Sequence, residues 1–293
     1  MTRAFVILGL TLVVADVARV ARCLDFYGTY SLGTRYAPSL PARVAELQGL
    51  DGNFVVATGK SLRDLDALPA GMLGAPGCSL MKAGDWKDTR GRWSEAVAGA
   101  RLGSLAAQFD NHPRVWGVCL SHEVDEFADH ARRVWMYRLA KQFFHQKEVF
   151  FYFGRVPEDY GKGHEREGDV LFYALPPFAR GGEYDMPKLR AKIESGLAVI
   201  DRTPGVPLWG QTSINADQKY VAGPDTMIRT WGPDGERMPE HVRELMSHTS
   251  PKGAGLSAFF WRSLGRFEWD LGYPAFAAQR ARVRDIGKQW RCR

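Results

Sequence analysis

The chain has 293 residues, of which 45% are hydrophobic and 25% are charged, which is ordinary globular composition and argues against a disordered or fibrous protein. This length suits one α/β barrel as well as two smaller domains. The formal net charge is +6, but the basic residues are scattered, so we expect no nucleic-acid partner; a mildly basic surface would instead favour approach to an acidic polysaccharide or a cell envelope.

The first 22 residues have the pattern of a secretory signal peptide. Thr2 and Arg3 give a short positive start, and a run of 12 apolar residues follows from Ala4 to Ala15. The run is too short to span a membrane, and no other run is long enough. We therefore expect a protein that is secreted or held in the cell envelope, without a membrane span after signal removal. The alternative is that residues 5–14 form an apolar first strand.

Strand and helix patterns then alternate along the whole chain, which is typical of parallel α/β architecture. The expected strands are continuously apolar rather than alternating, as in a parallel sheet that helices cover. These strands are expected at residues 24–30, 53–59, 71–80, 115–120, 148–153, 169–174, 206–210 and 255–261.

Helical segments separate most of these strands, and two of them start at the capping residues Ser61 and Ser94. The fifth connection differs, because a polar segment at 157–168 takes the place of a helix. The expected helices are residues 40–50, 61–68, 94–109, 126–145, 186–200, 239–248 and 276–290.

This count predicts a single (β/α)8 TIM barrel over residues 23–293. The alternative fold is a doubly wound open sheet. That fold would call for a Gly-rich phosphate loop after the first strand, and residues 27–33 lack the G-x-G-x-x-G pattern.

The four cysteines show no CxxC or Cys/His spacing, and the seven histidines show no H-x-H or H-E-x-x-H spacing, so we expect no metal site. In a closed barrel the first strand and the last helix are neighbours. An exported protein could therefore link Cys23 to Cys292 in a disulfide. Cys78 and Cys119 are expected to be small, buried core residues in the third and fourth strands.

Catalytic groups of a (β/α)8 barrel lie on the loops that follow the strands. Glu123 stands where the fourth strand ends, and apolar walls around it would raise its pKa, as a general acid requires. A structural ion pair with Arg155 or Lys82 is the alternative role. Aromatic side chains and an amide, which suit sugar rings and their hydroxyls, are expected to line the cleft: Tyr30, Trp86, Tyr173, Trp209, Gln211 and Trp261.

Cleavage of a glycosidic bond also needs a base or nucleophile on the opposite face of the sugar. Six carboxylates are candidates for this second group: Asp85, Asp125, Glu126, Glu158, Glu268 and Asp270. We favour Asp85, Glu268 and Asp270, since Asp125 and Glu126 are expected to cap the fourth helix. An alternating strand would point His122 away from Glu123.

The segment from Phe109 to Glu123 resembles the fourth-strand region of TIM-barrel glycoside hydrolases with a clan-A-like layout. It contains a helix end, an N-H-P turn, a V-x-G strand and a terminal Glu. The segments Trp209-Gly210-Gln211 and Phe259-Phe260-Trp261 resemble the seventh and eighth strands of these enzymes.

This resemblance implies a glycosidase that hydrolyses O-glycosidic bonds of a poly- or oligosaccharide. Glu123 takes the acid position, no cofactor is required, and the protein is expected to act as a monomer. Two positions depart from the pattern, because His122 replaces the usual Asn and Gln211 replaces the nucleophilic Glu. The alternative is therefore a barrel that binds carbohydrate without catalysis.

Overall fold

The computed structural model describes residues 26–29, 40–56, 62–175, 184–200, 202–203, 206, 208–212, 232–247, 254–258 and 277–291. Within these ranges, the eight predicted strands are all confirmed, some of them shorter than expected. They are β1 Phe26–Thr29, β2 Phe54–Val56, β3 Leu73–Ala75, β4 Gly117–Cys119, β5 Glu148–Phe153, β6 Leu171–Ala174, β7 Leu208–Thr212 and β8 Ala254–Ala258.

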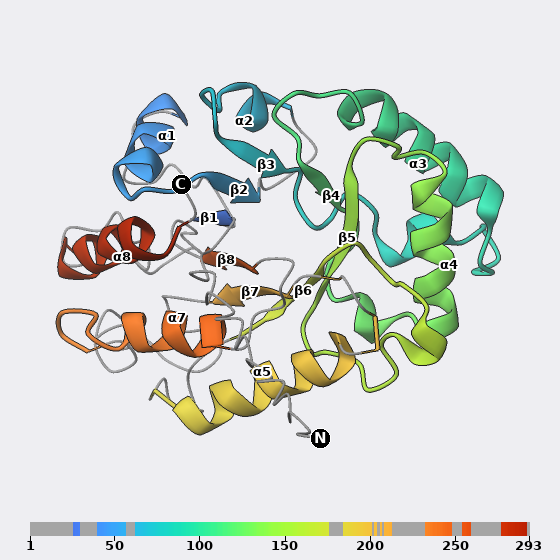
Figure 1. Cartoon of the computed structure of the whole chain (residues 1–293). Coiled ribbons are helices and arrows are strands. Elements are labelled where there is room, and N and C mark those ends of the chain that lie inside the picture. The colour runs from blue at the N-terminus through green and yellow to red at the C-terminus, as the bar shows by residue number, and fades with distance from the viewer. Residues whose placement is uncertain are drawn as a thin grey trace, which may run out of the picture.

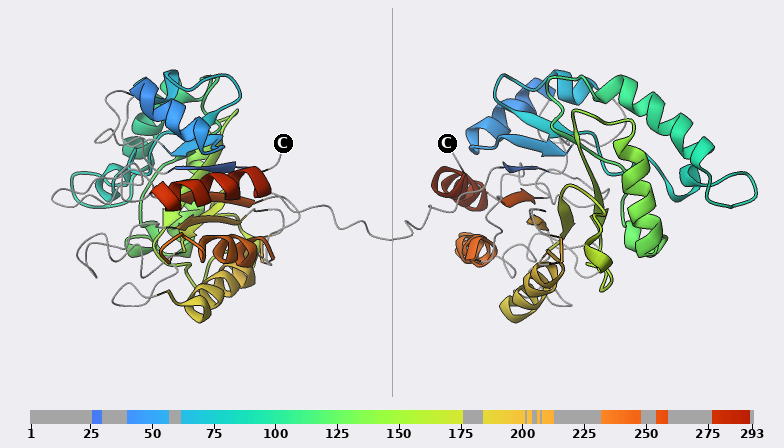
Figure 2. Two further views of the ribbon diagram at one scale, coloured as in Figure 1. Left: turned by 90° about the vertical axis from the view of Figure 1, so that its left-hand side faces the viewer. Right: turned by 45° about the vertical axis from the view of Figure 1, so that its right-hand side comes forward.

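The helices also lie where the sequence predicts them, and they surround the strands (Figure 1). In Figure 1 and in the right view of Figure 2, α3 and α4 lie on one side of the strands, and α7 and α8 pack together on the other. The helices are α1 Leu40–Gly49, α2 Arg63–Asp66, α3 Glu95–Phe109, α4 His130–Lys141, α5 Met186–Ile200, α7 Met238–Ser247 and α8 Ala277–Trp290.

The strand order is β3-β2-β1-β8-β7-β6-β5-β4, and every ladder within it is parallel. Strands that follow each other in the chain are therefore neighbours, and β1 lies beside β8. This is the strand order of a (β/α)8 barrel, as predicted, whereas a doubly wound sheet reverses its order at a switch point.

The two ends of this sheet, β3 and β4, meet at a short junction that we call the seam. A single parallel bridge joins Gly74 to Val115 there. The amide of Gly74 donates to the carbonyl of Arg114 at 2.9 Å, and the amide of Trp116 donates to the carbonyl of Gly74 at 2.9 Å. The seam thus brings the sheet ends together with far fewer backbone bonds than the ladders elsewhere.

A disulfide between Cys78 and Cys119 crosses the same seam, with Cα atoms 4.5 Å apart. Both cysteines are buried, as expected, but Cys78 lies after β3 and not within it, and the disulfide between the two was not predicted. The residues Cys23 and Cys292, for which the sequence predicted a disulfide, lie outside the described residues. Within the described residues, an ion pair of 2.9 Å between Arg291 and Asp51 connects the end of α8 to the turn after α1.

The apolar side chains form two separate clusters, one on each face of the strands. The larger cluster contains helix residues and fills the layer between strands and helices. The smaller cluster contains no helix residue, so it is the filling of the barrel interior. Its buried members are Phe54, Val56, Ala75, Cys78, Cys119, Phe150, Tyr152, Val170 and Phe172.

No α-helix connects β5 to β6, as predicted; the fully described segment between them contains only the 3-10 turn η3, Lys162–His164. An ionic network, largely buried, joins α4 to the connection between β5 and β6. Arg133 of α4, only 2% exposed, binds the fully buried Glu167 through Nε and Asp159 through Nη2 at 2.6 Å. His130 adds a 2.8 Å contact to Glu167, whose carboxylate also accepts the amide of Gly161.

Within the described ranges, no helix combines the length and apolar character that crossing a bilayer requires.

Candidate active site

The regular part of β4 stops at Cys119, yet the chain remains next to β5 for two more residues. The amide of Leu120 donates to the carbonyl of Phe150, and the amide of Tyr152 donates to the carbonyl of Ser121. His122 and Glu123 follow at the carboxyl end of the strand. In a (β/α)8 barrel, this end of the strands forms the mouth that holds the active site.

Glu123 has a left-handed backbone, with φ 49° and ψ 49°, just before the 3-10 turn η2, Val124–Glu126. Non-glycine residues rarely adopt this conformation, which is enriched at functional sites. The Glu123 side chain is 42% exposed. Neither Lys82 nor Arg155 forms a described ion pair with it, so the alternative drawn from the sequence, a structural ion pair with one of them, finds no support in this part of the chain.

The described ionic partner of Glu123 is its neighbour in the sequence. Nδ1 of His122 lies 3.4 Å from Oε2 of Glu123, and the His122 ring stacks on Tyr152 with centroids 4.5 Å apart. Our expectation that His122 points away from Glu123 is therefore wrong. The alternation of a strand ends with β4 at Cys119, and the left-handed turn brings the Glu123 carboxylate back towards the ring.

A second carboxylate, that of Asp125, lies close to Glu123. Oε1 of Glu123 and Oδ2 of Asp125 are both within 4 Å of the position that a Cβ on Gly154 would occupy. Asp125 accepts hydrogen bonds from the amides of Gly154 at 3.1 Å and Arg155 at 3.2 Å. It therefore fixes the turn after β5 and does not cap α4, which has Asp129 as its N-cap.

The third loop carries Asp85 and Trp86 in the 3-10 turn η1, Ala83–Trp86. The carboxylate of Asp85 accepts the backbone amide of Lys82 at 2.8 Å, which caps this turn. Trp86 is completely buried, contacts Trp135 of α4, and donates from Nε1 to Ser121 Oγ at 3.2 Å. Trp86 therefore packs on the helix side of the strands, which corrects the expectation that it lines a cleft.

Tyr173 requires the same correction. It is 1% exposed, and its hydroxyl donates to the backbone carbonyl of Lys192 in α5 at 2.8 Å. Its side chain therefore lies between the sheet and the helices, and burial raises the pKa of its phenol above the usual range.

The remaining predicted site residues are placed only in part. Trp209 and Gln211 lie in β7, in register with Phe172 and Ala174 of β6. Four predicted residues lie outside the described residues: Tyr30, Trp261, Glu268 and Asp270.

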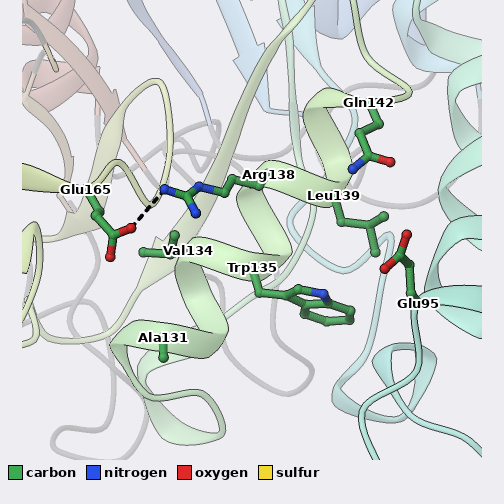
Figure 3. A pocket seen from close by; sticks show the side chains of 8 residues that line it. All are labelled: Glu95, Ala131, Val134, Trp135, Arg138, Leu139, Gln142 and Glu165. Atoms are coloured by element: carbon green, nitrogen blue, oxygen red, sulfur yellow. Dashed lines mark hydrogen bonds and ion pairs between the residues drawn. The ribbon is translucent and has the colours of Figure 1, made fainter.

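A pocket of about 430 Å³ lies on the outer side of α4 (Figure 3). Trp135 and Leu139 face Glu95 of α3 on one side, while Arg138 reaches Glu165 on the other at 2.8 Å. This pocket belongs to the helix layer and not to the strand ends. In the described part of the chain, no group of three or more His, Cys, Asp or Glu residues is arranged to hold a metal ion.

Known proteins resemble this chain in fold but not in sequence. Neither a family model nor a curated protein matches the sequence. A GH5_18 structure from Streptomyces cattleya in complex with GlcNAc matches with a TM-score of 0.56 at 13% identity, over 92% of this chain and 81% of that one. A GH5_18 variant from Bifidobacterium longum in complex with Manb1-4GlcNAc matches with a TM-score of 0.56 at 9% identity, over 90% and 78% of the two chains.

The β-glucuronidase of Ruminococcus gnavus has a TM-score of 0.57 at 12% identity; the match covers 90% of this chain and 50% of the enzyme. The fold is that of the TIM-barrel glycoside hydrolases. At this level of identity the similarity establishes the fold alone. The similarity therefore assigns no catalytic residue to this chain.

Proposed function

We propose that the protein hydrolyses O-glycosidic bonds of a poly- or oligosaccharide, with Glu123 as the general acid. The observation that supports this proposal is the position of Glu123: its partly exposed carboxylate lies at the carboxyl end of β4 in a barrel of glycosidase fold. A carboxylic acid there can protonate the leaving oxygen as the glycosidic bond breaks.

The second carboxylate acts from the opposite face of the sugar, as nucleophile or as the base that activates water. Glu268 and Asp270, which follow β8 in the sequence, remain our proposals for this role. Asp85 is a weaker candidate, because its carboxylate already caps a turn. Asp125 lies beside Glu123, but its oxygens accept two backbone amides, which suits a fixed structural carboxylate.

Replacing the acid tests this proposal. Glu123→Gln keeps the shape of the side chain but cannot donate a proton from a carboxyl group, so turnover should fall by 10² or more. Hydrolysis would be followed by release of reducing ends from a polysaccharide panel and by chromogenic glycosides. The chromogenic glycosides should carry N-acetylglucosamine, mannose or glucuronic acid as the sugar, since the structurally similar proteins are complexed with these sugars or act on them.

Glu126→Gln is the matched control, because it removes an exposed carboxylate three residues away. The proposal fails if Glu123→Gln retains full turnover while both variants unfold at the temperature of the parent protein.

One observation favours a second function, a barrel that binds carbohydrate without cleaving it. Gln211 stands in β7, the strand whose end carries the nucleophilic Glu in the enzymes that the sequence resembles. A binder would retain affinity for an oligosaccharide, measured by calorimetry, with no product released by the parent protein or by Glu123→Gln.

We also propose that the protein works outside the reducing cytoplasm. The Cys78–Cys119 disulfide supports this localisation, since disulfides persist in oxidising compartments. Fractionation of the source cells, with the mass of the recovered chain, tests the location and the removal of residues 1–22. Recovery of the unprocessed chain in the cytoplasm would contradict it.

A further inference from the structure

A column of aromatic rings leads from the barrel interior to Glu123. Phe172 of β6 contacts Tyr152 of β5 with ring centroids 5.3 Å apart, and Tyr152 stacks on His122 at 4.5 Å with the planes 26° apart. Phe172 and Tyr152 are both buried members of the interior cluster. The imidazole of His122 therefore rests on a rigid support rather than on a loop.

The column ends at the acid. Nδ1 of His122 lies 3.4 Å from Oε2 of Glu123, and the two side chains are 35% and 42% exposed. The His122 ring is thus packed against Tyr152, while both side chains remain partly accessible to solvent. Two further groups face the pair in the described part: the phenol ring of Tyr152 and the carboxylate of Asp125 across the Gly154 edge.

We propose that His122 is a positioning residue for Glu123, and that its imidazolium form pairs with the Glu123 carboxylate. With one proton on the pair, it exists either as imidazolium and carboxylate or as imidazole and carboxylic acid. The second form can donate: the O–H bond of Glu123 breaks, the proton goes to the leaving oxygen, and the glycosidic C–O bond breaks with its electron pair on that oxygen. A water oxygen then bonds to the anomeric carbon, directly or by displacing the second carboxylate, and the proton that this water loses restores the protonated pair.

The pairing itself can be tested without activity. The imidazole of His122 would be titrated by NMR in the parent protein, in Glu123→Gln and in Glu126→Gln. Loss of the neighbouring negative charge should lower the imidazole pKa by about half a unit or more in Glu123→Gln, a shift reduced by the partial exposure of the pair. Glu126→Gln should leave it unchanged, and the exposed His145 provides an internal reference in each sample. An unchanged His122 titration in Glu123→Gln overturns the pairing.

The catalytic consequence rests on the proposed function. His122→Phe retains an aromatic ring over Tyr152 but removes the nitrogen that faces Glu123. We expect kcat to fall at least about tenfold with KM within about threefold, because the acid is misplaced while most substrate contacts remain. His145→Phe, at an exposed position, is the control. Equal kcat values for His122→Phe and the parent protein would contradict the positioning role.

The two failures are distinguishable. If the titration of His122 responds to Glu123→Gln but no glycoside is cleaved by the parent protein, the pairing holds and the hydrolase proposal is wrong. If Glu123→Gln abolishes turnover while the His122 titration and the kcat of His122→Phe are unaffected, the hydrolase proposal holds and the role of His122 is wrong.

Discussion

Glu123 occupies a left-handed backbone conformation that disfavours any residue with a Cβ atom. The benefit of this conformation is positional: it turns the carboxylate back to His122 at the end of β4. A residue chosen for stability alone at such a turn would be glycine. Glu at φ 49° therefore carries a local steric cost that glycine would avoid.

This strain can be measured with two variants that both lack the carboxylate. Glu123→Gly should be more stable than Glu123→Ala by about 1 kcal/mol, because glycine adopts positive φ without a steric penalty. The free energy of unfolding in urea gives the difference directly. An alanine variant as stable as the glycine variant would mean that residue 123 is not held in the left-handed region.

Residue-level prediction from the sequence succeeded for the position of Glu123 and failed for its surroundings. The strand containing Tyr173 is apolar at every position because both of its faces are buried. Such a strand shows no alternation, so the sequence cannot tell which side chains face the interior. Trp86 lies in the 3-10 turn η1, where no strand or helix period indicates which way a side chain points. His122 was missed because its direction depends on where β4 ends.

Among the elements, the connection between β5 and β6 is the most unusual, since an ionic network replaces a helix. Arg133 and Glu167 can both be buried only because their opposite charges form an ion pair, since an isolated buried charge is strongly unfavourable. The carboxylate of Glu167 also receives His130 and the amide of Gly161, so it organises the whole connection.

Removing the charge of Glu167 should therefore destabilise the protein more than removing a surface charge nearby. We expect Glu167→Gln to lower the free energy of unfolding by about 3 kcal/mol, because it leaves the buried Arg133 with the partly exposed Asp159 as its remaining described carboxylate partner. Glu165→Gln is the comparison: Glu165 is 39% exposed and pairs with the exposed Arg138 at 2.8 Å and with His130 at 3.3 Å, so its loss should amount to less than about 1 kcal/mol.

Chemical denaturation of the three proteins under one condition makes this comparison. Equal losses in the two variants would show that the network contributes no more than a surface ion pair.

The elements themselves were largely predictable from local signals. Ser94 is a cap, as predicted, and its hydroxyl accepts the amide of Val97 at the start of α3. The polar segment at 157–168 contains no α-helix, as predicted. The strand ends were less predictable. The third strand was expected at residues 71–80 but comprises only Leu73–Ala75. A Gly-rich segment does not show in the sequence where a strand begins and ends.

At the scale of the whole molecule, the two ends of the strand order meet at the seam. The single Gly74–Val115 bridge is reinforced by the Cys78–Cys119 disulfide, which joins positions 41 residues apart. No local sequence pattern could reveal this pair. β3 and β4 are the first and last strands of the sheet order, and the two cysteines come together only when these two ends meet at the seam.

The double variant Cys78→Ala/Cys119→Ala should lose about 2–4 kcal/mol of unfolding free energy, because its unfolded chain is no longer constrained by the cross-link. Unfolding in urea, with and without a reductant, checks this value. The reductant should destabilise the parent protein alone. A parent protein that responds no more than the double variant would show that the disulfide contributes nothing to closure.

The seam has a practical bearing on how the protein is produced. A cytoplasmic expression host would deliver the chain with both thiols reduced, leaving β3 and β4 held by one bridge. Exposed sheet edges can pair with the strands of other chains, so the reduced protein should form inclusion bodies. Export to the periplasm, or a host strain that catalyses disulfide formation, should yield monodisperse protein.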